Sequence, residues 1–415
     1  MSGERGRPRI VVTGLGAVSP LGLNARSSFE AARDGVCAIA PVVLDPGPNG
    51  PEAHTTPAAL VSGDLLGAAE AALGRRLGAS LDPFSLMAIA SAHEALSQAG
   101  LTGHPVLEER TALVTGHGFA GIHTLEAGYE RFFGGKLPRI HPLTVPKVMV
   151  SAPVSAIAME FKIRGPVFAV SSACASSGHA IAQGAGFIAT GEADVAIVGG
   201  SEAIVTPCCL RAWEGLQAMT ASTCRPFSKG RDGMAIGEGG AMLVLERLEH
   251  AEARGATILA ELSGVGLSSD AFHWTQPSLA GAVSAMSKAM ASAGMGEGER
   301  LLISTHGTGT PLNDKNEAAA LRQVFGARIA HQPVIATKSA HGHLIGAATV
   351  LQGVIALQAM NDGLAPPILG FLEADPDCDL DLVLGEVRPV AVDGLLLNSF
   401  AFGGLNTSLV FRRWG

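Results

Sequence analysis

Short runs of β-branched and apolar residues alternate with Ala-rich stretches along most of the chain. The short runs predict strands and the Ala-rich stretches predict helices. This alternation is typical of an α/β protein whose sheets are largely buried. The predicted strands are 9–13, 111–114, 167–170, 195–198, 241–246, 258–265, 301–304, 334–336, 395–397 and 408–411. The predicted helices are 25–33, 83–99, 176–190, 279–293, 314–325 and 344–361.

The sequence also contains a weak internal repeat. The segment RTALVTGHG, which begins at Arg110, resembles the segment RLLISTHGT, which begins at Arg300. The strand and turn that end at Cys174 resemble those that end at His343, and a helix is predicted after each. Two similar halves that meet near residue 250 would bring these turns face to face. We therefore expect an N-terminal half over 1–250 and a C-terminal half over 251–415.

Composition argues against several other classes of protein. The chain has 415 residues, of which 47% are hydrophobic and 16% charged, so it can bury a large core. Its net charge of −8 argues against nucleic-acid binding, because phosphate contacts require clustered Lys and Arg. Six cysteines without a CxxC pair argue against disulfides or a zinc site. We recognise no signal peptide or membrane span, and we expect a cytoplasmic location.

Cys174 is the first candidate for chemistry. It stands between a predicted buried strand and a predicted helix, in the segment VSSACASSGH. The free N–H groups and the positive end of the dipole at a helix N-terminus favour a thiolate. The same N–H groups can stabilise the oxyanion of a reacting thioester. Small residues on both sides of Cys174 leave room for a substrate, so we expect a reactive nucleophile here.

Two further segments place histidines after predicted strands. In STHGTGTPLNDKNE, His306 lies on a Gly-rich loop, and the hydroxyls of Thr308 and Thr310 follow. In ATKSAHGHLIGAA, His343 comes just before a predicted helix, and Lys338 stands five residues earlier. We expect the helix dipole to keep the imidazole of His343 neutral and able to donate a hydrogen bond.

Two other features complete the candidate site. Asp314 and Glu317 lie one turn apart at the start of a predicted helix, where carboxylates are favoured. The segment NSFAFGGLN has two adjacent glycines between two strands, which allows a close approach of the backbone to a ligand. Phe402 in this segment is placed to close the site.

These motifs, with the segments 11–22 and 225–239, resemble those of the elongating β-ketoacyl-[acyl carrier protein] synthases, in the same order over nearly the whole chain. The resemblance implies a five-layer αβαβα thiolase fold with two pseudo-symmetric halves. It implies an acyltransferase that joins an acyl group held on Cys174 to malonyl-acyl carrier protein by decarboxylative Claisen condensation, in fatty-acid or polyketide elongation. It also implies a homodimer, or a heterodimer with a related subunit. No cofactor is expected, because the carrier's phosphopantetheine arm holds the substrates.

The resemblance also implies roles for individual residues. Cys174 would be the nucleophile, His306 and His343 the histidine pair, and Lys338 the active-site lysine. The N–H groups of Cys174 and Phe402 would form the oxyanion hole, and Phe402 would be the gate. The remaining site residues would be Thr308 and Thr310 along the phosphopantetheine arm, Phe119 and Phe400 around the substrate, and Asp314 and Glu317 in support.

Some positions depart from the family pattern. Gln352 stands where the family usually has Glu, nine residues after the second His, and Ser304 and Leu397 also differ. These positions surround a structural cation in some relatives, so we expect no metal here. Phe119 stands where a smaller aliphatic residue usually lines the acyl tunnel, which predicts a shorter tunnel.

The carrier protein of this family is acidic, so docking on a chain of net charge −8 requires a local basic surface. The candidates are Arg75, Arg76, Lys136 and Arg139. One alternative is the ketosynthase subunit of a specialised polyketide or signal-lipid heterodimer. A non-catalytic chain-length subunit lacks the reactive Cys, and a degradative thiolase has a second Cys in its C-terminal loop, so this sequence favours neither. It leaves open the acyl chain length, the pathway and the identity of the partner subunit.

Overall fold

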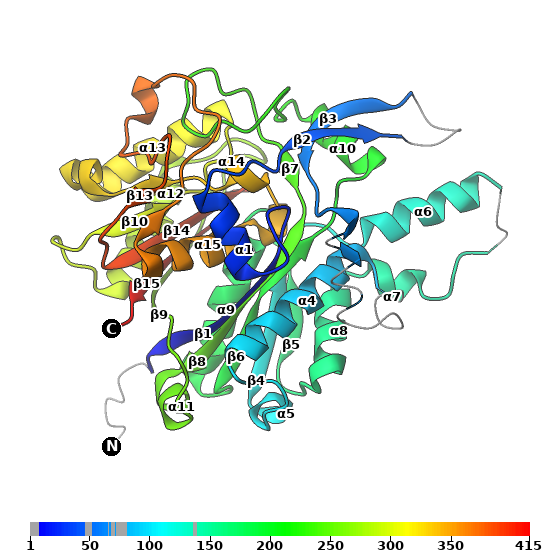
Figure 1. The fold of residues 1–415 in the computed structure, drawn as a ribbon, viewed down its shortest axis with the longest axis horizontal. Coiled ribbons are helices and arrows are strands. Elements are labelled where there is room, and N and C mark those ends of the chain that lie inside the picture. The colour runs from blue at the N-terminus through cyan, green and yellow to red at the C-terminus, as the bar shows by residue number, and fades with distance from the viewer. Residues whose placement is uncertain (1–7, 46–51, 65, 68–70, 72–80, 136–138) are drawn as a thin grey trace.

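The structure, a computed structural model, describes the chain except for residues 1–7, 46–51, 65, 68–70, 72–80 and 136–138. Its centre is a ten-stranded sheet (Figure 1). From one edge to the other, the strands are β11 (Val334–Ile335), β10 (Leu301–Ser304), β14 (Gly394–Ala401), β15 (Leu405–Arg413), β9 (Ala260–Ser269), β1 (Ile10–Val18), β8 (Gly239–Arg247), β6 (Val195–Glu202), β4 (Thr111–Gly116) and β5 (Val167–Val170).

The sheet consists of two halves with the same strand pattern. In the N-terminal half, β4 runs parallel to β5 and β6, and β8 and β1 continue antiparallel. In the C-terminal half, β10 runs parallel to β11 and β14, and β15 and β9 continue antiparallel. Only two residue pairs join β1 to β9. The sequence repeat therefore has a structural counterpart, in which β4 corresponds to β10 and β5 to β11.

Helices cover both faces of this sheet (Figure 1). On the outer face of the N-terminal half lie α4 (Pro83–Gln98) and α8 (Ala152–Phe161). On the outer side of the C-terminal half, α12 (Leu279–Ala293) packs on the strands and α13 (Pro311–Phe325) packs on α12. Between the halves lie α9 (Ser176–Thr190) and α15 (Ala348–Asp362). The result is the five-layer αβαβα thiolase fold that the resemblance implies.

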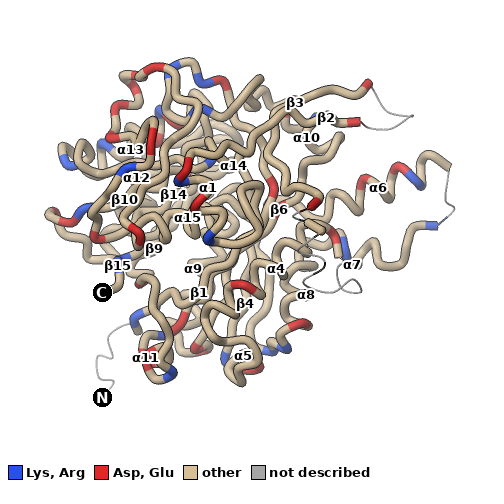
Figure 2. Tube along the Cα trace, viewed as in Figure 1, with Lys and Arg blue, Asp and Glu red and all other residues tan. Residues whose placement is uncertain are grey.

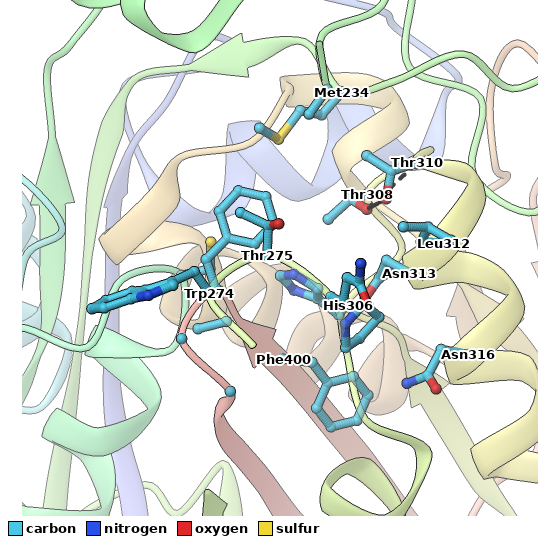
Figure 3. Close-up of a pocket in the computed structure, with 18 of the residues that line it drawn as sticks. Met234, Trp274, Thr275, His306, Thr308, Thr310, Leu312, Asn313, Asn316 and Phe400 are labelled. Carbon is cyan, nitrogen blue, oxygen red and sulfur yellow. Dashed lines mark hydrogen bonds between the residues drawn. The ribbon is translucent and has the colours of Figure 1, made fainter. Parts of the chain in front are cut away.

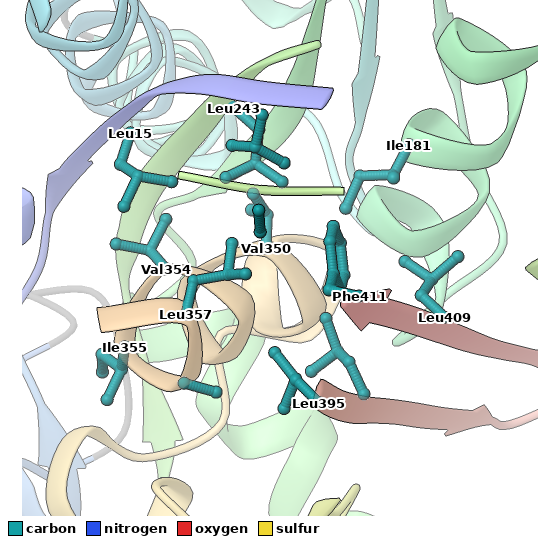
Figure 4. Packing of buried hydrophobic residues seen from close by; sticks show 14 of the residues in the cluster. Leu15, Ile181, Leu243, Val350, Val354, Ile355, Leu357, Leu395, Leu409 and Phe411 are labelled. Atoms are coloured by element: carbon teal, nitrogen blue, oxygen red, sulfur yellow. The ribbon is translucent and has the colours of Figure 1, made fainter. Parts of the chain in front are cut away.

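The two middle helices are apolar because protein surrounds them. In α15, twelve of the fifteen residues are buried, and one core cluster combines this helix with strands of both halves (Figure 4). Leu15 and Leu243 reach the helix from the N-terminal half, and Leu395 and Phe411 from the C-terminal half. None of the described helices combines the length and the apolar character that a membrane span requires.

The remaining elements lie around this core. A small sheet is formed by β2 (Ala40–Leu44), β3 (His54–Ala59) and β7 (Ile236–Gly237). An arm that contains α6 (Ile122–Phe133) and α7 (Thr144–Val148) extends from the body beside the N-terminal half (Figure 1). The other short elements are α1 (Ala25–Arg33), α5 (Val106–Glu109), α10 (Pro207–Gly215), α11 (Leu248–Ala253), α14 (Lys338–His341), β12 (Leu364–Ala365), β13 (Arg388–Pro389), and the 3-10 turns η1 (Gly326–His331), η2 (Ile345–Ala347) and η3 (Pro376–Cys378).

Candidate active site

Cys174 lies in the tight turn between β5 and α9. The preceding residue, Ala173, has φ of +49°, a left-handed conformation that costs a non-glycine residue about 1–2 kcal/mol. The C-terminal half holds the turn in place, because the hydroxyls of Ser399 (2.9 Å) and Thr349 (3.3 Å) donate to the carbonyl oxygen of Cys174. Both halves of the molecule therefore position the cysteine.

The same turn packs directly on the end of β4. A Cβ atom placed on Gly116 would lie 2.1 Å from the carbonyl carbon of Ser176, so only glycine permits this approach. Ser176 also links the turn internally, since its hydroxyl accepts from the N–H of Ser172 at 2.8 Å and contacts the carbonyl of Ala173 at 2.7 Å. The position of Cys174 is thus determined by backbone packing as well as by the cross-half hydroxyls.

The Cys174 sulfur is buried and faces backbone donors. The backbone N–H groups of Phe402 and of Cys174 itself are near enough to favour its charged form. Burial raises the pKa of the thiol to about 11, while the nearby Lys338 charge and these two N–H groups oppose the rise. The expectation that a helix N-terminus would make Cys174 acidic is therefore wrong. The helix begins two residues later, at Ser176, and loss of solvation outweighs the favourable terms.

The two histidines lie opposite the cysteine. The sulfur of Cys174, one ring nitrogen of His306 and one of His343 all lie within 4.8 Å of one another. The two imidazole rings meet edge to face, with centroids 5.5 Å apart. Because Cys174 belongs to the N-terminal half and both histidines to the C-terminal half, the two equivalent turns face each other, as the repeat predicts.

Hydrogen bonds define the tautomer of each imidazole. Nδ1 of His343 accepts the N–H of Ile345 at 3.0 Å, and its Nε2 is buried without a partner among the described residues. Nδ1 of His306 lies 3.4 Å from Nζ of Lys338. In both neutral rings the proton therefore sits on Nε2, and His343 aims a free donor into the site.

Both histidines are neutral for a different reason than we expected. Burial, and then the charge of Lys338, hold the pKa of His306 and of His343 well below its ordinary value. The helix dipole is not the cause, because α15 begins only at Ala348, and η2 intervenes after His343. The predicted helix 344–361 is correct only from Ala348 onward.

The carboxylates of Asp314 and Glu317 hydrogen-bond to the backbone of the loop that carries His306, and they do not line the cavity. Glu317 accepts the N–H groups of His306 (2.8 Å) and Gly307 (2.9 Å). Asp314 accepts the N–H of Thr308 at 3.1 Å. Their helix, α13, starts at Pro311, three residues earlier than predicted. Both carboxylates therefore support the loop, as the resemblance implies.

A cavity of about 370 Å³ connects this cluster to the surface. Figure 3 shows His306, Thr308, Thr310, Phe400 and Trp274 around it. The two threonine hydroxyls lie 2.8 Å apart on one wall. Trp274 also lines the cavity although it is 83% exposed, so it marks the mouth. Nothing in the sequence pointed to Trp274.

The aromatic residues near Phe402, the predicted gate, form a stack that the sequence did not reveal. The ring of Phe402 stacks on Trp213 with centroids 6.3 Å apart, and Trp213 contacts Phe119 at 6.0 Å. Phe119 is not among the described residues that line the cavity; it packs with Trp213 in an apolar cluster that also includes Phe402. The contact of Phe119 with the substrate stays a prediction; Trp213 contacts both Phe119 and Phe402, the predicted gate.

Glu202 is a second residue that sequence reasoning missed. Its carboxylate accepts the N–H groups of Gly118 (2.8 Å), Phe119 (3.1 Å) and Gly346 (3.0 Å), so it links the two halves behind the histidine loop. Burial raises its pKa to about 7. A carboxylate at the end of an otherwise apolar strand was the available signal.

Most of the residues predicted to bind the carrier protein, Arg75, Arg76 and Lys136, lie outside the described residues. Arg139 is exposed in the connection between α6 and α7. Figure 2 shows Lys and Arg intermixed with Asp and Glu over the described chain. The docking surface remains a prediction.

Comparison with known proteins identifies the family. Residues 7–251 match the family model described as β-ketoacyl synthase, N-terminal domain, and residues 259–372 match the one for the C-terminal domain. The chain is 40% identical to nodulation protein E of Rhizobium sp. (strain N33) over 410 residues, which cover 98% of this chain and 99% of that protein. It is 33% identical to 3-oxoacyl-[acyl-carrier-protein] synthase 2 of Coxiella burnetii over 418 residues, covering 98% of each.

A solved structure agrees with these sequence relatives. The ishigamide ketosynthase/chain length factor has a TM-score of 0.89 at 32% identity and covers 99% of this chain and 100% of its own. The similarity extends over both halves and therefore includes the two turns that form the site. The chain belongs to the β-ketoacyl synthase family.

Proposed function

We propose that this protein catalyses the decarboxylative condensation of an acyl group on Cys174 with malonyl-acyl carrier protein. The observation that carries the proposal is the convergence of one thiol and two imidazoles within 4.8 Å at the end of a cavity. The imidazoles are neutral and present Nε2–H donors, the form needed to stabilise an enolate rather than to accept a proton.

In the first step Cys174 takes the acyl group from the carrier. Its thiolate attacks the thioester carbonyl, the carrier sulfur leaves, and the thiol proton of Cys174 ends on that sulfur. The N–H groups of Cys174 and Phe402 face the sulfur and are placed to bind the oxyanion of the tetrahedral intermediate. The positive charge of Lys338 favours the thiolate in a site where burial opposes it.

In the second step the malonyl thioester occupies the same cavity. The bond to its carboxylate breaks, CO2 leaves, and the electron pair becomes an enolate whose oxygen accepts hydrogen bonds from His306 and His343. Each such donor typically contributes about 3 kcal/mol in the transition state. The enolate carbon attacks the acyl-Cys174 carbonyl and expels the Cys174 thiolate, which yields the β-ketoacyl product.

The relatives also support a proposal about partners. The name 3-oxoacyl-[acyl-carrier-protein] synthase contains the carrier, and the ishigamide structure combines a ketosynthase with a chain length factor. We propose acyl carrier protein as the substrate carrier and a related ketosynthase-like chain as the second subunit, in the cytoplasm. The higher identity to nodulation protein E than to 3-oxoacyl-[acyl-carrier-protein] synthase 2 favours a specialised pathway.

The rival functions fit the site less well. A non-catalytic chain-length subunit has no need of a free thiol opposite two neutral imidazoles, and this chain has all three. A degradative thiolase requires a second cysteine at the site. Among the described residues that line the cavity, Cys174 is the only cysteine.

The test is to measure the rates of the two steps separately in the variant His343→Ala. We expect acylation of Cys174, followed by intact-protein mass, to proceed at a rate close to that of the wild type. Malonyl decarboxylation should fall by about 10²–10³-fold, because one donor to the enolate is lost. Cys174→Ala should abolish acylation, and exposed His331→Ala should change neither step. Equal loss of both steps in His343→Ala would contradict the assigned roles.

A further inference from the structure

Lys338 is a buried cation held by neutral acceptors. An ammonium group has three N–H donors. Here they face the carbonyl oxygen of His306 (2.5 Å), Oε1 of Gln352 (2.6 Å) and, more weakly, Nδ1 of His306 (3.4 Å). Lys338 is 0% exposed. In the described part of the chain, no carboxylate oxygen lies within 4.0 Å of its Nζ, the distance that defines an ion pair. A buried charge without a direct counter-ion is costly and calls for a physical reason.

Gln352 supplies the central contact from the middle of α15. It is fully buried, its Oε1 accepts from Lys338, and its Nε2 donates to the carbonyl of Thr305 at 2.5 Å. These two partners fix the orientation of the amide, because the ammonium can only donate and the carbonyl can only accept. Gln352 therefore orients Lys338 without neutralising it, at a position where the family pattern has Glu.

The carboxylates near Lys338 already have backbone partners, so Cys174 is the main group on which the charge of Lys338 acts. The carboxylate of Glu317 already accepts two backbone N–H groups, and Asp314 binds the loop beyond it. Among the charges that favour the protonated lysine, Cys174 contributes most, ahead of Glu317. The titratable groups whose charges interact with Lys338 are Cys174, Cys224, His306, Asp314, Glu317, His341 and His343.

We propose that Gln352 is a positioning residue whose neutral amide keeps Lys338 as the counter-ion of the Cys174 thiolate and directs one of its N–H groups to His306. The inference rests on the proposed function only because that function makes Cys174 the nucleophile. A carboxylate at position 352 would pair with Lys338 and cancel most of its field. Because Lys338 lowers the pKa of Cys174 and of both histidines, all three values would then rise.

The experiment compares Gln352→Glu with Gln352→Met, which is neutral and similar in length. Iodoacetamide alkylation of Cys174 is measured against pH on the full chain, with the site read by peptide mass. In Gln352→Glu we expect the midpoint to rise by at least about one pH unit, so that alkylation at pH 8 is about tenfold slower. Gln352→Met should raise the midpoint less than Gln352→Glu, because it removes one acceptor of the Lys338 ammonium without adding a negative charge beside it. A purely structural role would slow both variants and shift neither midpoint.

Substitution of Lys338 itself is the second part of the experiment. Lys338→Met should raise the midpoint of Cys174 alkylation. Adding Gln352→Glu to Lys338→Met should raise this midpoint little further, because Gln352→Glu acts on Cys174 through the charge of Lys338, which is then absent. If Gln352→Glu does not fold in a thermal scan, the midpoint of Gln352→Met, expected between those of the wild type and Lys338→Met, still tests the proposal. An unshifted Lys338→Met, a folded but unshifted Gln352→Glu, or an equally shifted Gln352→Met would overturn it. Alkylation requires no carrier, so a wild-type chain that fails to condense refutes the proposed function alone.

Discussion

At the scale of single residues, burial and hydrogen bonding oppose each other at three carboxyl groups. Glu202 and Glu317 each accept backbone N–H groups, yet burial raises the pKa of each to about 7. Burial also raises the pKa of Glu238 to about 8. Glu238 has one partner, the N–H of Val61 at 3.2 Å, and its other oxygen is buried without a partner in the described structure. Transfer from water to the interior therefore outweighs the hydrogen bonds at all three sites.

The three shifts predict a pH dependence of stability. A carboxyl whose pKa is higher in the folded state than in the unfolded state stabilises the fold when protonated. That contribution is fully present below the unfolded value of about 4.5 and is lost as the pH rises through about 7 to 8. Buried neutral histidines such as His306 and His343 act in the opposite direction below their ordinary pKa of 6.5, so we expect the net fall in melting temperature between pH 7 and pH 8.

Glu238→Gln should flatten part of this dependence, because the amide stays neutral and has nearly the same shape. The gain in melting temperature should be largest at pH 8 and absent at pH 4. Exposed Glu297→Gln serves as the control and should leave the curve unchanged. A wild-type melting temperature that rises from pH 7 to pH 8 would contradict the sign of the effect.

At the scale of elements, the sequence predicted those whose pattern is local. Residues 25–33, 176–190 and 279–293 were predicted as helices, and the structure has α1, α9 and α12 with these bounds. The start of α15 was missed because the backbone of His343 pairs with the strand region around β7, and Ile345 adopts φ of +42°. Strands β2 and β3 were missed because each contains a proline, which normally argues against a strand.

The same distinction applies to the site. Cys174, His306 and His343 stand in local motifs, and the structure brings all three together. Gln352 was noticed only as a departure from a pattern, and Trp213 not at all. Their contacts, to Lys338 and to the gate, come from packing between distant segments, and single-sequence periodicity carries no information about such contacts.

The gate stack predicts a limit on the acyl chain. Phe402 rests on Trp213, so the ring of Trp213 lies behind the predicted gate, and we expect a longer acyl chain to meet this ring. Trp213→Ala should raise the rate of Cys174 acylation by long acyl thioesters relative to short ones, read by intact mass over a graded chain series. Phe119→Ala should have a smaller effect, because Phe119 contacts the gate only through Trp213. If the wild type already prefers long chains, the aromatic stack does not limit the tunnel.

At the scale of the whole molecule, the two halves share their largest core cluster. Only two residue pairs connect the sheet halves directly, but α15 packs on β8 from one half and on β14 from the other. Leu357 of this helix is fully buried in that cluster. The active site needs the same junction, because it takes the thiol from one half and the imidazoles from the other. Folding and assembly of the site should therefore be one cooperative event.

Leu357→Ala tests whether the halves unfold together. Deletion of a buried leucine side chain costs about 2–5 kcal/mol, and here the loss falls on a helix that both halves use. Hydrogen exchange under denaturant, read on peptides from β6 and β14, should show the same opening free energy in the wild type and an equal decrease in the variant. Leu372→Ala, at a residue that is 68% exposed, should change either value by less than about 0.5 kcal/mol. A decrease confined to β14 would mean that the C-terminal half opens alone, and His306 and His343 could then separate from Cys174 while the N-terminal half stays folded.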